Sequence, residues 1–502
     1  MDLKNLPPHG GLLVFGKSRL KTQKLTANLN SDGVLTPNFF FLKSSPILKI
    51  SAGDQHALFS SQNRTYAFGI NDWGQLGIKQ EMKQEVDKPV LIKPLKNIDI
   101  LDISCGRSHN LVLTGNGGHK DAKTLYSFGS NTDSQLGIPG GQATSTPLSI
   151  STKTYPNFPK NVVKVASGSD FSVALTTDGV LYGWGDNDSG QLGDKSLEQE
   201  VQSPARIKLN ATLRKNVGTV IDVVCGYHST ILLTSTGLAL IAGENFGNDF
   251  KSLNTPEPVK LICMLGSGKI IFVGNLSGSV FISAEIDESQ EGSNNRDLQF
   301  TKIPFSPQIS PNNNNNQIVV QQLSAGYEHA AIITNNKHLY TFGDSNQGQL
   351  CHGNKLSSQD YFKKVTFCEN ELNFNSVCCG GSFTIISVSP KNSQLMKSVS
   401  FSGYEPDTED NNLSSIREGA NANHGQPAPH NQTRNNNNLQ TIPEGVETAP
   451  QTSGGLFSSC KSKPKTQNKS NQSSVDTRAP DQNVATNTST LEPKKSSSCT
   501  VL

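Results

Sequence analysis

The sequence predicts an all-β fold, a seven-bladed β-propeller over residues 11–390, followed by a disordered polar tail over residues 391–502. Three observations support this prediction. A glycine-led pair of strands recurs seven times, several copies end in nearly the same Gln-Leu-Gly string, and apolar periodicity stops near residue 394. Short antiparallel strands repeated around an axis bury their faces against neighbouring blades, and closure of the ring leaves only short sheet edges.

Each repeat unit begins with small residues and a glycine and continues as an alternating apolar strand. It then turns into a second strand, mostly through pairs such as Asp-Gly or Asn-Asn, which tolerate positive φ and are typical of β-hairpins. Spacings of roughly 40 to 60 residues leave room for two further strands per unit. The leading glycines of the structural repeat are Gly53, Gly106, Gly168, Gly226, Gly266, Gly326 and Gly380.

One string recurs at the end of the second strand, as YAFGINDWGQLG, YSFGSNTDSQLG, YGWGDNDSGQLG and YTFGDSNQGQLC. Glycine after the aromatic residue permits a close backbone approach or an unusual φ, the polar segment forms a tight turn, and the leucine fills the core between blades. The string is therefore predicted to be scaffold. The units led by Gly226 and Gly266 have lost its end, so we expect their loops to contribute least to partner binding.

The two ends of the repeat region are complementary. Residues 12–16 look like a second strand without a hairpin partner, and the last unit has a first strand but no second. We therefore expect residues 12–16 to complete the blade begun by residues 379–389. Residues 286–317, with a run of five asparagines, are expected to be a flexible insertion within the propeller.

Composition excludes several classes of function. The formal net charge of +2 gives no global basic field, so nucleic acid is not expected as a partner. The sequence has neither a run of about 18 apolar residues nor a cleavable leader, so we expect a cytoplasmic protein. The nine cysteines lack the spacing of a disulfide framework, which fits a reducing compartment. No catalytic triad or paired-carboxylate pattern is found, so neither catalytic residues nor a cofactor or metal are expected.

Two motifs invite a functional interpretation and have a structural alternative. Residues 11–18, GLLVFGKS, fit a phosphate-binding loop, but their middle is itself the predicted strand, so a strand is favoured. A ring of histidines around the axis would suit a metal. However, packing or a backbone hydrogen bond is favoured, because other units have Phe171, Lys269 and Phe383 at the position of the histidines. Those histidines are His56, His109, His228 and His329.

With these repeats, the chain resembles the regulator of chromosome condensation superfamily of seven-bladed propellers. Within it, the chain is most similar to the retinitis pigmentosa GTPase regulator family, whose pattern appears here as FGKSR, SAGDQH and FGINDWGQLG. The resemblance covers about residues 11–390 and the last four. It implies a ciliary location at the basal body and transition zone, with the Golgi or centrosome as further sites.

The resemblance also implies partners. These are a propeller-binding ciliary scaffold protein with coiled-coil and C2 domains, a prenyl-binding carrier of the type of the delta subunit of rod phosphodiesterase, and Rab- or Arf-like small GTPases. Two functions stay open: a scaffold, and a guanine nucleotide exchange factor for a Ran- or Rab-type GTPase. The resemblance implies that the superfamily's exchange factor uses a basic amino-terminal arm and a protruding wedge. The scaffold is favoured, because the first strand is expected to begin near Leu12 without such an arm, and the longest wedge candidate, residues 138–161, is not a convincing hairpin.

The last four residues, Cys499, Thr500, Val501 and Leu502, fit a prenylation box, and leucine at the end favours geranylgeranyl. An accidental terminal cysteine is the alternative. One prenyl chain anchors reversibly, so a second membrane signal is expected. Lys494 and Lys495 supply a basic one, and Cys460 is a weaker candidate for palmitate. The lysines of residues 461–469 resemble a nuclear signal, but a solvated basic stretch is favoured.

Overall fold

The structure, a computed structural model, describes residues 10–16, 28–29, 35–36, 38–40, 42, 45–79, 85–115, 123–151, 155, 158–159, 161–284, 298–306, 318–353 and 358–391. The chain divides into two units, Met1–Arg417 and Glu418–Leu502, and every described residue belongs to the first. Cys460, Lys494, Lys495 and residues 499–502 therefore lie outside the described residues. In the described part of the chain, no helix has the length and apolar character that crossing a bilayer requires.

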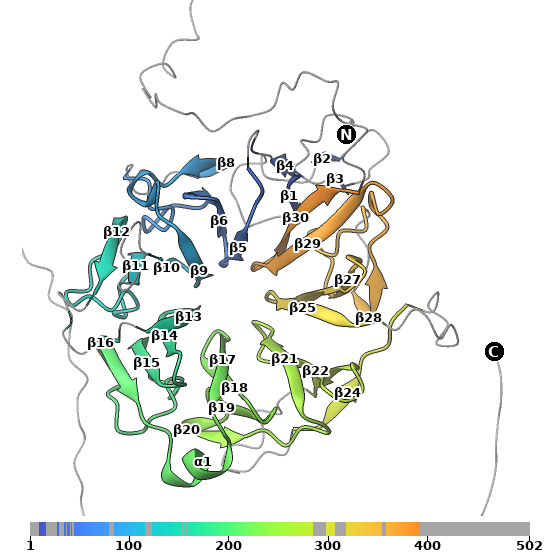
Figure 1. Cartoon of the computed structure of the whole chain (residues 1–502). Helices are drawn as coiled ribbons and strands as arrows, with labels where there is room; N and C mark the ends of the chain where they lie inside the picture. The colour runs from blue at the N-terminus through green and yellow to red at the C-terminus, as the bar shows by residue number, and fades with distance from the viewer. Residues whose placement is uncertain are drawn as a thin grey trace, which may run out of the picture. The chain divides into compact units, whose positions relative to one another are not determined.

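The described residues form seven four-stranded antiparallel sheets around one centre, which confirms the predicted seven-bladed propeller (Figure 1). Blade 1 contains β5 (Lys49–Ala52), β6 (His56–Ser61), β7 (Arg64–Gly69) and β8 (Val86–Leu91). Blade 2 contains β9 (Ile100–Cys105), β10 (His109–Thr114), β11 (Thr124–Gly129) and β12 (Thr144–Ile150). Blade 3 contains β13 (Val162–Ser167), β14 (Phe171–Thr176), β15 (Leu181–Asp186) and β16 (Glu200–Ile207).

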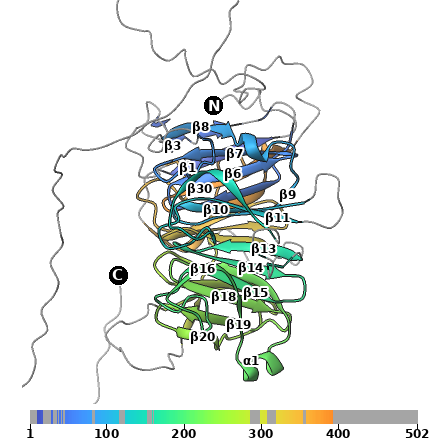
Figure 2. The ribbon, with the colours of Figure 1, turned by 90° about the vertical axis from the view of Figure 1, so that its left-hand side faces the viewer.

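Blade 4 contains β17 (Val220–Cys225), β18 (Ser229–Thr234), β19 (Ala239–Gly243) and β20 (Gly247–Ser252). Blade 5 contains β21 (Val259–Met264), β22 (Ile270–Gly274), β23 (Val280–Ser283) and β24 (Phe300–Lys302). Blade 6 contains β25 (Val320–Ala325), β26 (His329–Thr334), β27 (Leu339–Gly343) and β28 (Gln359–Lys364). Three small elements lie outside the blades: the pair β2 (Asn28–Leu29) and β3 (Leu35–Thr36), the 3-10 turn η3 (Lys93–Leu95), and α1 (Ala211–Asn216). Helix α1 lies at the rim of the ring beside β20 (Figures 1 and 2).

Blade 7 joins the two ends of the propeller. It contains, in spatial order, β29 (Leu372–Cys379), β30 (Phe383–Pro390), β1 (Gly11–Gly16) and β4 (Asn38–Phe40). β1 pairs with β30 along its whole length, from Gly11 opposite Val388 to Gly16 opposite Phe383, and its other edge pairs with β4. Two strands from each end therefore close the ring. The edge strand β4 was not predicted from the sequence.

The core lies between adjacent blades. Strands β6, β10, β14, β18 and β26 are buried at every residue, because both faces of each sheet pack against a neighbour. Leu76 and Leu192 of the Gln-Leu-Gly strings are fully buried in these layers. Their predicted role in the core is confirmed.

One predicted boundary needs correction. Residues 300–302, inside the predicted flexible insertion 286–317, form β24, the outer strand of blade 5. The Phe300 ring packs edge-on against Phe272 with centroids 5.1 Å apart, and Ile303 just beyond is buried. Apolar contacts thus hold this short segment to the sheet, although the asparagine-rich sequence around it lies outside the described residues.

Because alternate strands run in opposite directions, each blade has two different ends. The loop end carries the glycine-led turns between first and second strands and the Gln-Leu-Gly loops between third and fourth. The hairpin end carries the turns between second and third strands and the connections to the next blade. Backbone hydrogen bonds, such as Gly381 N–H to Gly53 C=O (3.2 Å) and Tyr327 N–H to Gly381 C=O (3.1 Å), join the loop ends of neighbouring blades. All loop ends therefore lie on one side of the ring.

Candidate functional site

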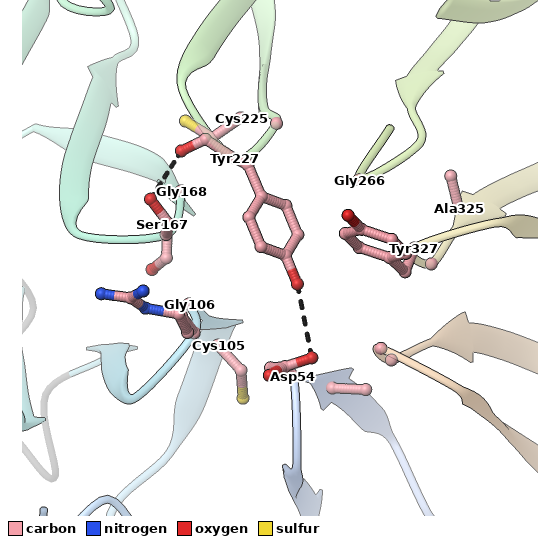
Figure 3. A pocket seen from close by; sticks show the side chains of 18 of the residues that line it. Asp54, Cys105, Gly106, Ser167, Gly168, Cys225, Tyr227, Gly266, Ala325 and Tyr327 are labelled. Atoms are coloured by element: carbon pink, nitrogen blue, oxygen red, sulfur yellow. Dashed lines mark hydrogen bonds between the residues drawn. The ribbon is translucent and has the colours of Figure 1, made fainter. Parts of the chain in front are cut away.

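The seven leading glycines, from Gly53 in blade 1 to Gly380 in blade 7, meet around the central channel. With the residues beside them they line a cavity of about 110 Å³ (Figure 3). That volume holds a few water molecules of about 30 Å³ each, whereas sites for small molecules usually enclose about 300–1,000 Å³. The channel is therefore too small to be a pocket for a metabolite.

Three of the four predicted histidines share one environment. Each ring is buried and its Nε2 atom forms a hydrogen bond with a side chain of the next blade: His56 with Asn110 Oδ1 (2.8 Å), His109 with Ser172 Oγ (3.0 Å) and His329 with Thr384 Oγ1 (2.9 Å). Burial lowers the pKa of His56 to about 4, of His109 to about 3 and of His329 to about 4. These neutral rings link consecutive blades, so the predicted packing role is confirmed, with side-chain partners across the blades.

The fourth, His228, does not share this position, so its alignment with the others was wrong. Ser229 begins β18 and pairs with Gly243, as His56 begins β6 and pairs with Gly69. His228 precedes the strand, and its side chain is 39% exposed with Nδ1 3.9 Å from Asp186 Oδ2. Among the described residues, no group of three or more His, Cys, Asp or Glu side chains is arranged to hold a metal.

Two tyrosines that the sequence reading missed narrow the channel mouth. Tyr227 Oη donates a hydrogen bond to Asp54 Oδ1 at 3.3 Å, from blade 4 to blade 1 (Figure 3). Its ring packs edge-on against Tyr327 with centroids 5.5 Å apart. Burial and the nearby Asp54 charge raise the pKa of Tyr227, so its hydroxyl stays protonated. The sequence feature that could have predicted these two side chains is a tyrosine directly after the leading glycine, in CGYHS and AGYEH.

A second contact between blades lies beside the tyrosines. Arg107 forms an ion pair with Asp170 of the next blade, and Gln135 Nε2 donates to the same carboxylate at 3.0 Å. Burial raises the pKa of Asp170, against the opposing effect of Arg107. Gln135 belongs to a Gln-Leu-Gly string, so this string also fixes charged groups at the channel mouth.

The loop end is acidic in the described part of the chain. Carboxylates of its turns and loops include Asp54, Asp133, Asp188, Glu244, Glu328 and Asp344, against the basic side chains Lys79, Arg107, Lys195 and Lys269. Trp73 is 43% exposed on one Gln-Leu-Gly loop, where the other strings have Asp133, Ser189 and Gln347. A broad polar surface with an exposed indole suits a macromolecular partner, since aromatic residues are enriched at protein interfaces.

The predicted alternative for the GLLVFGKS motif is confirmed. Its first six residues are β1, which is buried throughout. A phosphate-binding loop offers free backbone amides at the start of a helix, whereas β1 is a central strand that pairs with β30 on one edge and β4 on the other. The motif match is therefore a coincidence of strand sequence.

The family model described as "RCC1-like domain" matches residues 11–386 of this chain. The chain is similar to proteins named X-linked retinitis pigmentosa GTPase regulator, with 30% identity over 434 residues in Canis lupus familiaris and 28% over 433 residues in Homo sapiens. These matches cover 77% of this chain but only 36% and 35% of those proteins, so the chain spans about a third of their length.

Solved structures share the fold. The structure of Prp20p from Saccharomyces cerevisiae matches with a TM-score of 0.60 at 18% identity, over 79% of this chain and 95% of that chain. Human WBSCR16 matches with a TM-score of 0.59 at 21% identity, over 75% and 99%. The glycine-led blades, the closing seam and the match over residues 11–386 lead to one assignment: the chain belongs to the RCC1-like domain family.

Proposed function

We propose that the protein is a prenylated propeller scaffold that binds protein partners at its loop end, in ciliary protein trafficking or transition-zone organisation and in small-GTPase regulation. The main support is the acidic loop end, which surrounds a channel too small for a metabolite. Identity of 30% to a retinitis pigmentosa GTPase regulator supports the ciliary setting. The proposed partners are a ciliary scaffold protein, a prenyl-binding carrier of the phosphodiesterase delta type, and Rab- or Arf-like GTPases.

The lipid is proposed on Cys499. A transferase would join a geranylgeranyl group to its sulfur as a thioether, with diphosphate leaving, and the last three residues would then be removed. One such chain contributes about 0.8 kcal/mol per buried CH₂ and anchors reversibly. Lys494 and Lys495 would each add about 1 kcal/mol at an anionic surface, and palmitate on Cys460 would provide a further anchor.

The test compares wild type with Cys499→Ser in cells fed a labelled isoprenoid. We expect the variant to lose the label and most of its membrane and ciliary fraction. Cys460→Ser is the matched control, which should keep the isoprenoid label and lose only part of the membrane fraction. Equal label, or equal membrane fractions, in wild type and Cys499→Ser would refute the proposal. Farnesyl in place of geranylgeranyl would change only the role given to Leu502.

Guanine nucleotide exchange on a Ran- or Rab-type GTPase is the second candidate, supported by the name GTPase regulator of the similar proteins. It is tested by nucleotide release from purified GTPases in the presence of the full chain. A scaffold should leave release unchanged while still binding. Acceleration of tenfold or more that Trp73→Ala and Glu328→Lys abolish would instead favour an exchange factor.

A further inference from the structure

Large aliphatic side chains are exposed at the hairpin end of blades 3 to 5. Leu276, in the turn between β22 and β23, is 78% exposed, and Ile221 in β17 is 56% exposed. Val163 in β13 and Leu238 before β19 are exposed as well. Val163 and Ile221 occupy β-bulges, where the register with the next strand shifts. A bulged residue is left without a partner in the ladder, which here places an aliphatic side chain at the surface.

These four residues lie on neighbouring segments of the hairpin end, and we call them the aliphatic patch. An ion pair between Lys164 and Asp222 joins the residues that directly follow Val163 and Ile221. The turn that carries Leu238 hydrogen-bonds to the connection before β17 (2.8 Å) and to the first residue of β21 (2.8 Å). Leu276 N–H donates to Glu257 in the connection before β21 (2.9 Å). Each member is therefore tied to the segment that carries the next.

Basic side chains border the aliphatic patch. Arg214 and Lys215 are exposed in the last turn of α1, and Lys260 is exposed in β21. Three described carboxylates lie at this end: Asp222 pairs with Lys164, Asp178 accepts from Asn161 Nδ2 (2.9 Å), and Glu257 accepts from the Leu276 and Ser277 amides. The described basic side chains of this end outnumber its carboxylates, so it is positive, whereas the loop end on the opposite side is acidic; the basic residues include Lys164, Lys208, Arg214, Lys215 and Lys260.

We propose that the hairpin end of blades 3 to 5 docks on an anionic lipid surface. Aliphatic side chains flanked by arginine and lysine are what an interfacial membrane contact requires, because the apolar groups enter the headgroup boundary while the cations meet phosphates. This proposal rests on the proposed function in one respect: the prenyl group on Cys499 would bring the propeller to the membrane.

Docking at this end would set the orientation of the whole propeller. The acidic loop end would point away from the anionic bilayer, which repels it, and Trp73 would stay accessible to partners. The lipid alone would not fix this orientation, because Cys499 lies 109 residues beyond Pro390, the last residue of β30.

The test uses the full chain made in bacteria, which lack protein prenyltransferases for a C-terminal box, and vesicles of phosphatidylcholine with or without about 30 mol % phosphatidylserine. We expect sedimentation with the anionic vesicles only. Arg214→Glu with Lys215→Glu should weaken binding at least about tenfold. Lys79→Glu with Lys195→Glu, which changes the net charge equally at the loop end, is the matched control and should bind as wild type does. Equal losses in both variants, or no binding of wild type, would overturn the proposal. Since the protein carries no prenyl group, these results do not depend on Cys499.

A second measurement reports which side meets the lipid. Leu276→Trp is made in a Trp73→Phe background, and its emission is compared with that of wild type, whose exposed indole is Trp73 at the loop end. On anionic vesicles the indole introduced at position 276 should shift to the blue and resist acrylamide quenching, while Trp73 should remain quenchable. The reverse pattern would mean that the loop end docks. Protection of neither would mean that the tail binds the vesicles.

Discussion

At the residue scale, leading glycines such as Gly106 leave space for the side chain three residues later, which here is His109. A Cβ on Gly106 would overlap the His109 ring and lie 2.5 Å from the carbonyl oxygen of Gly168 in the next blade. Gly106→Ala is therefore expected to lower the free energy of unfolding by about 1–3 kcal/mol, the usual cost of overpacking. Thermal or urea unfolding measures this.

A matched substitution separates the overlap from a general effect of alanine. The Cβ of Gly115→Ala would meet the Asp99 Oδ2 atom at 3.0 Å, and the exposed Asp99 side chain can rotate away. This variant should change stability by less than about 0.5 kcal/mol. Equal losses in Gly106→Ala and Gly115→Ala would contradict the packing explanation.

The buried histidines predict a dependence of stability on pH. The pKa of His109 is about 3 in the folded state and about 6.5 in the unfolded chain. The unfolded chain therefore takes up the proton first, and stability falls as pH drops below about 6.5, by about 1.4 kcal/mol per pH unit for each such histidine. Phenylalanine occupies this position as Phe171 and Phe383, so His109→Phe should fold.

His109→Phe should make the loss of stability between pH 7 and pH 5 smaller by about 2 kcal/mol. Ser172, which loses its partner, still donates to the Gln135 carbonyl at 2.8 Å, so little stability should be lost at pH 7. The measurement is urea unfolding of both proteins at the two pH values. Parallel losses in wild type and variant would show that His109 is not buried as a neutral ring.

At the element scale, β1 is the strand on which closure depends. Its residues Leu12, Leu13, Val14 and Phe15 are at most 4% exposed, and burial of each contributes about 1.5–3 kcal/mol. Their sum is comparable with the whole stability of a typical domain, about 5–15 kcal/mol. Deletion of residues 1–18 should therefore leave the propeller unfolded or aggregated at 25 °C, as judged by circular dichroism.

Deletion of residues 1–9 alone is the control for this experiment. It keeps β1 intact and should melt within about 2 °C of the full chain. If the longer deletion also melts cooperatively at that temperature, then β1 is not needed for closure.

The inner strands were predictable from sequence, whereas the outer ones were not. Strands such as β6 and β14 are buried at every residue, and each follows a glycine-led turn. These features produce a strong apolar pattern in the sequence. Outer strands such as β20 and β24 are short and partly exposed, with sequences GNDFKS and FTK. Their pairing depends on the neighbouring strand rather than on their own periodicity.

At the scale of the whole molecule, the candidate sites depend on residues far apart in sequence. His109 meets Ser172 63 residues later through the packing of consecutive blades, whereas Tyr227 meets Asp54 across 173 residues only because the ring brings blades 4 and 1 together. The distribution of charged side chains over the surface also depends on the fold and not on the sequence order alone. A net charge of +2 gives no sign that carboxylates gather at the loop end and basic side chains border the aliphatic patch, because that separation follows from strand direction.

The seam in blade 7 has a consequence for biosynthesis. β1 leaves the ribosome first, but its partner β30 follows only after about 370 further residues, which takes roughly 20–75 s at ordinary elongation rates. During that time β1 can pair only with the three-residue β4, and its edge toward β30 stays open, although blades 1 to 6 are each contiguous and able to form in turn. A nascent chain should therefore need chaperone protection at its amino terminus until translation has passed Pro390.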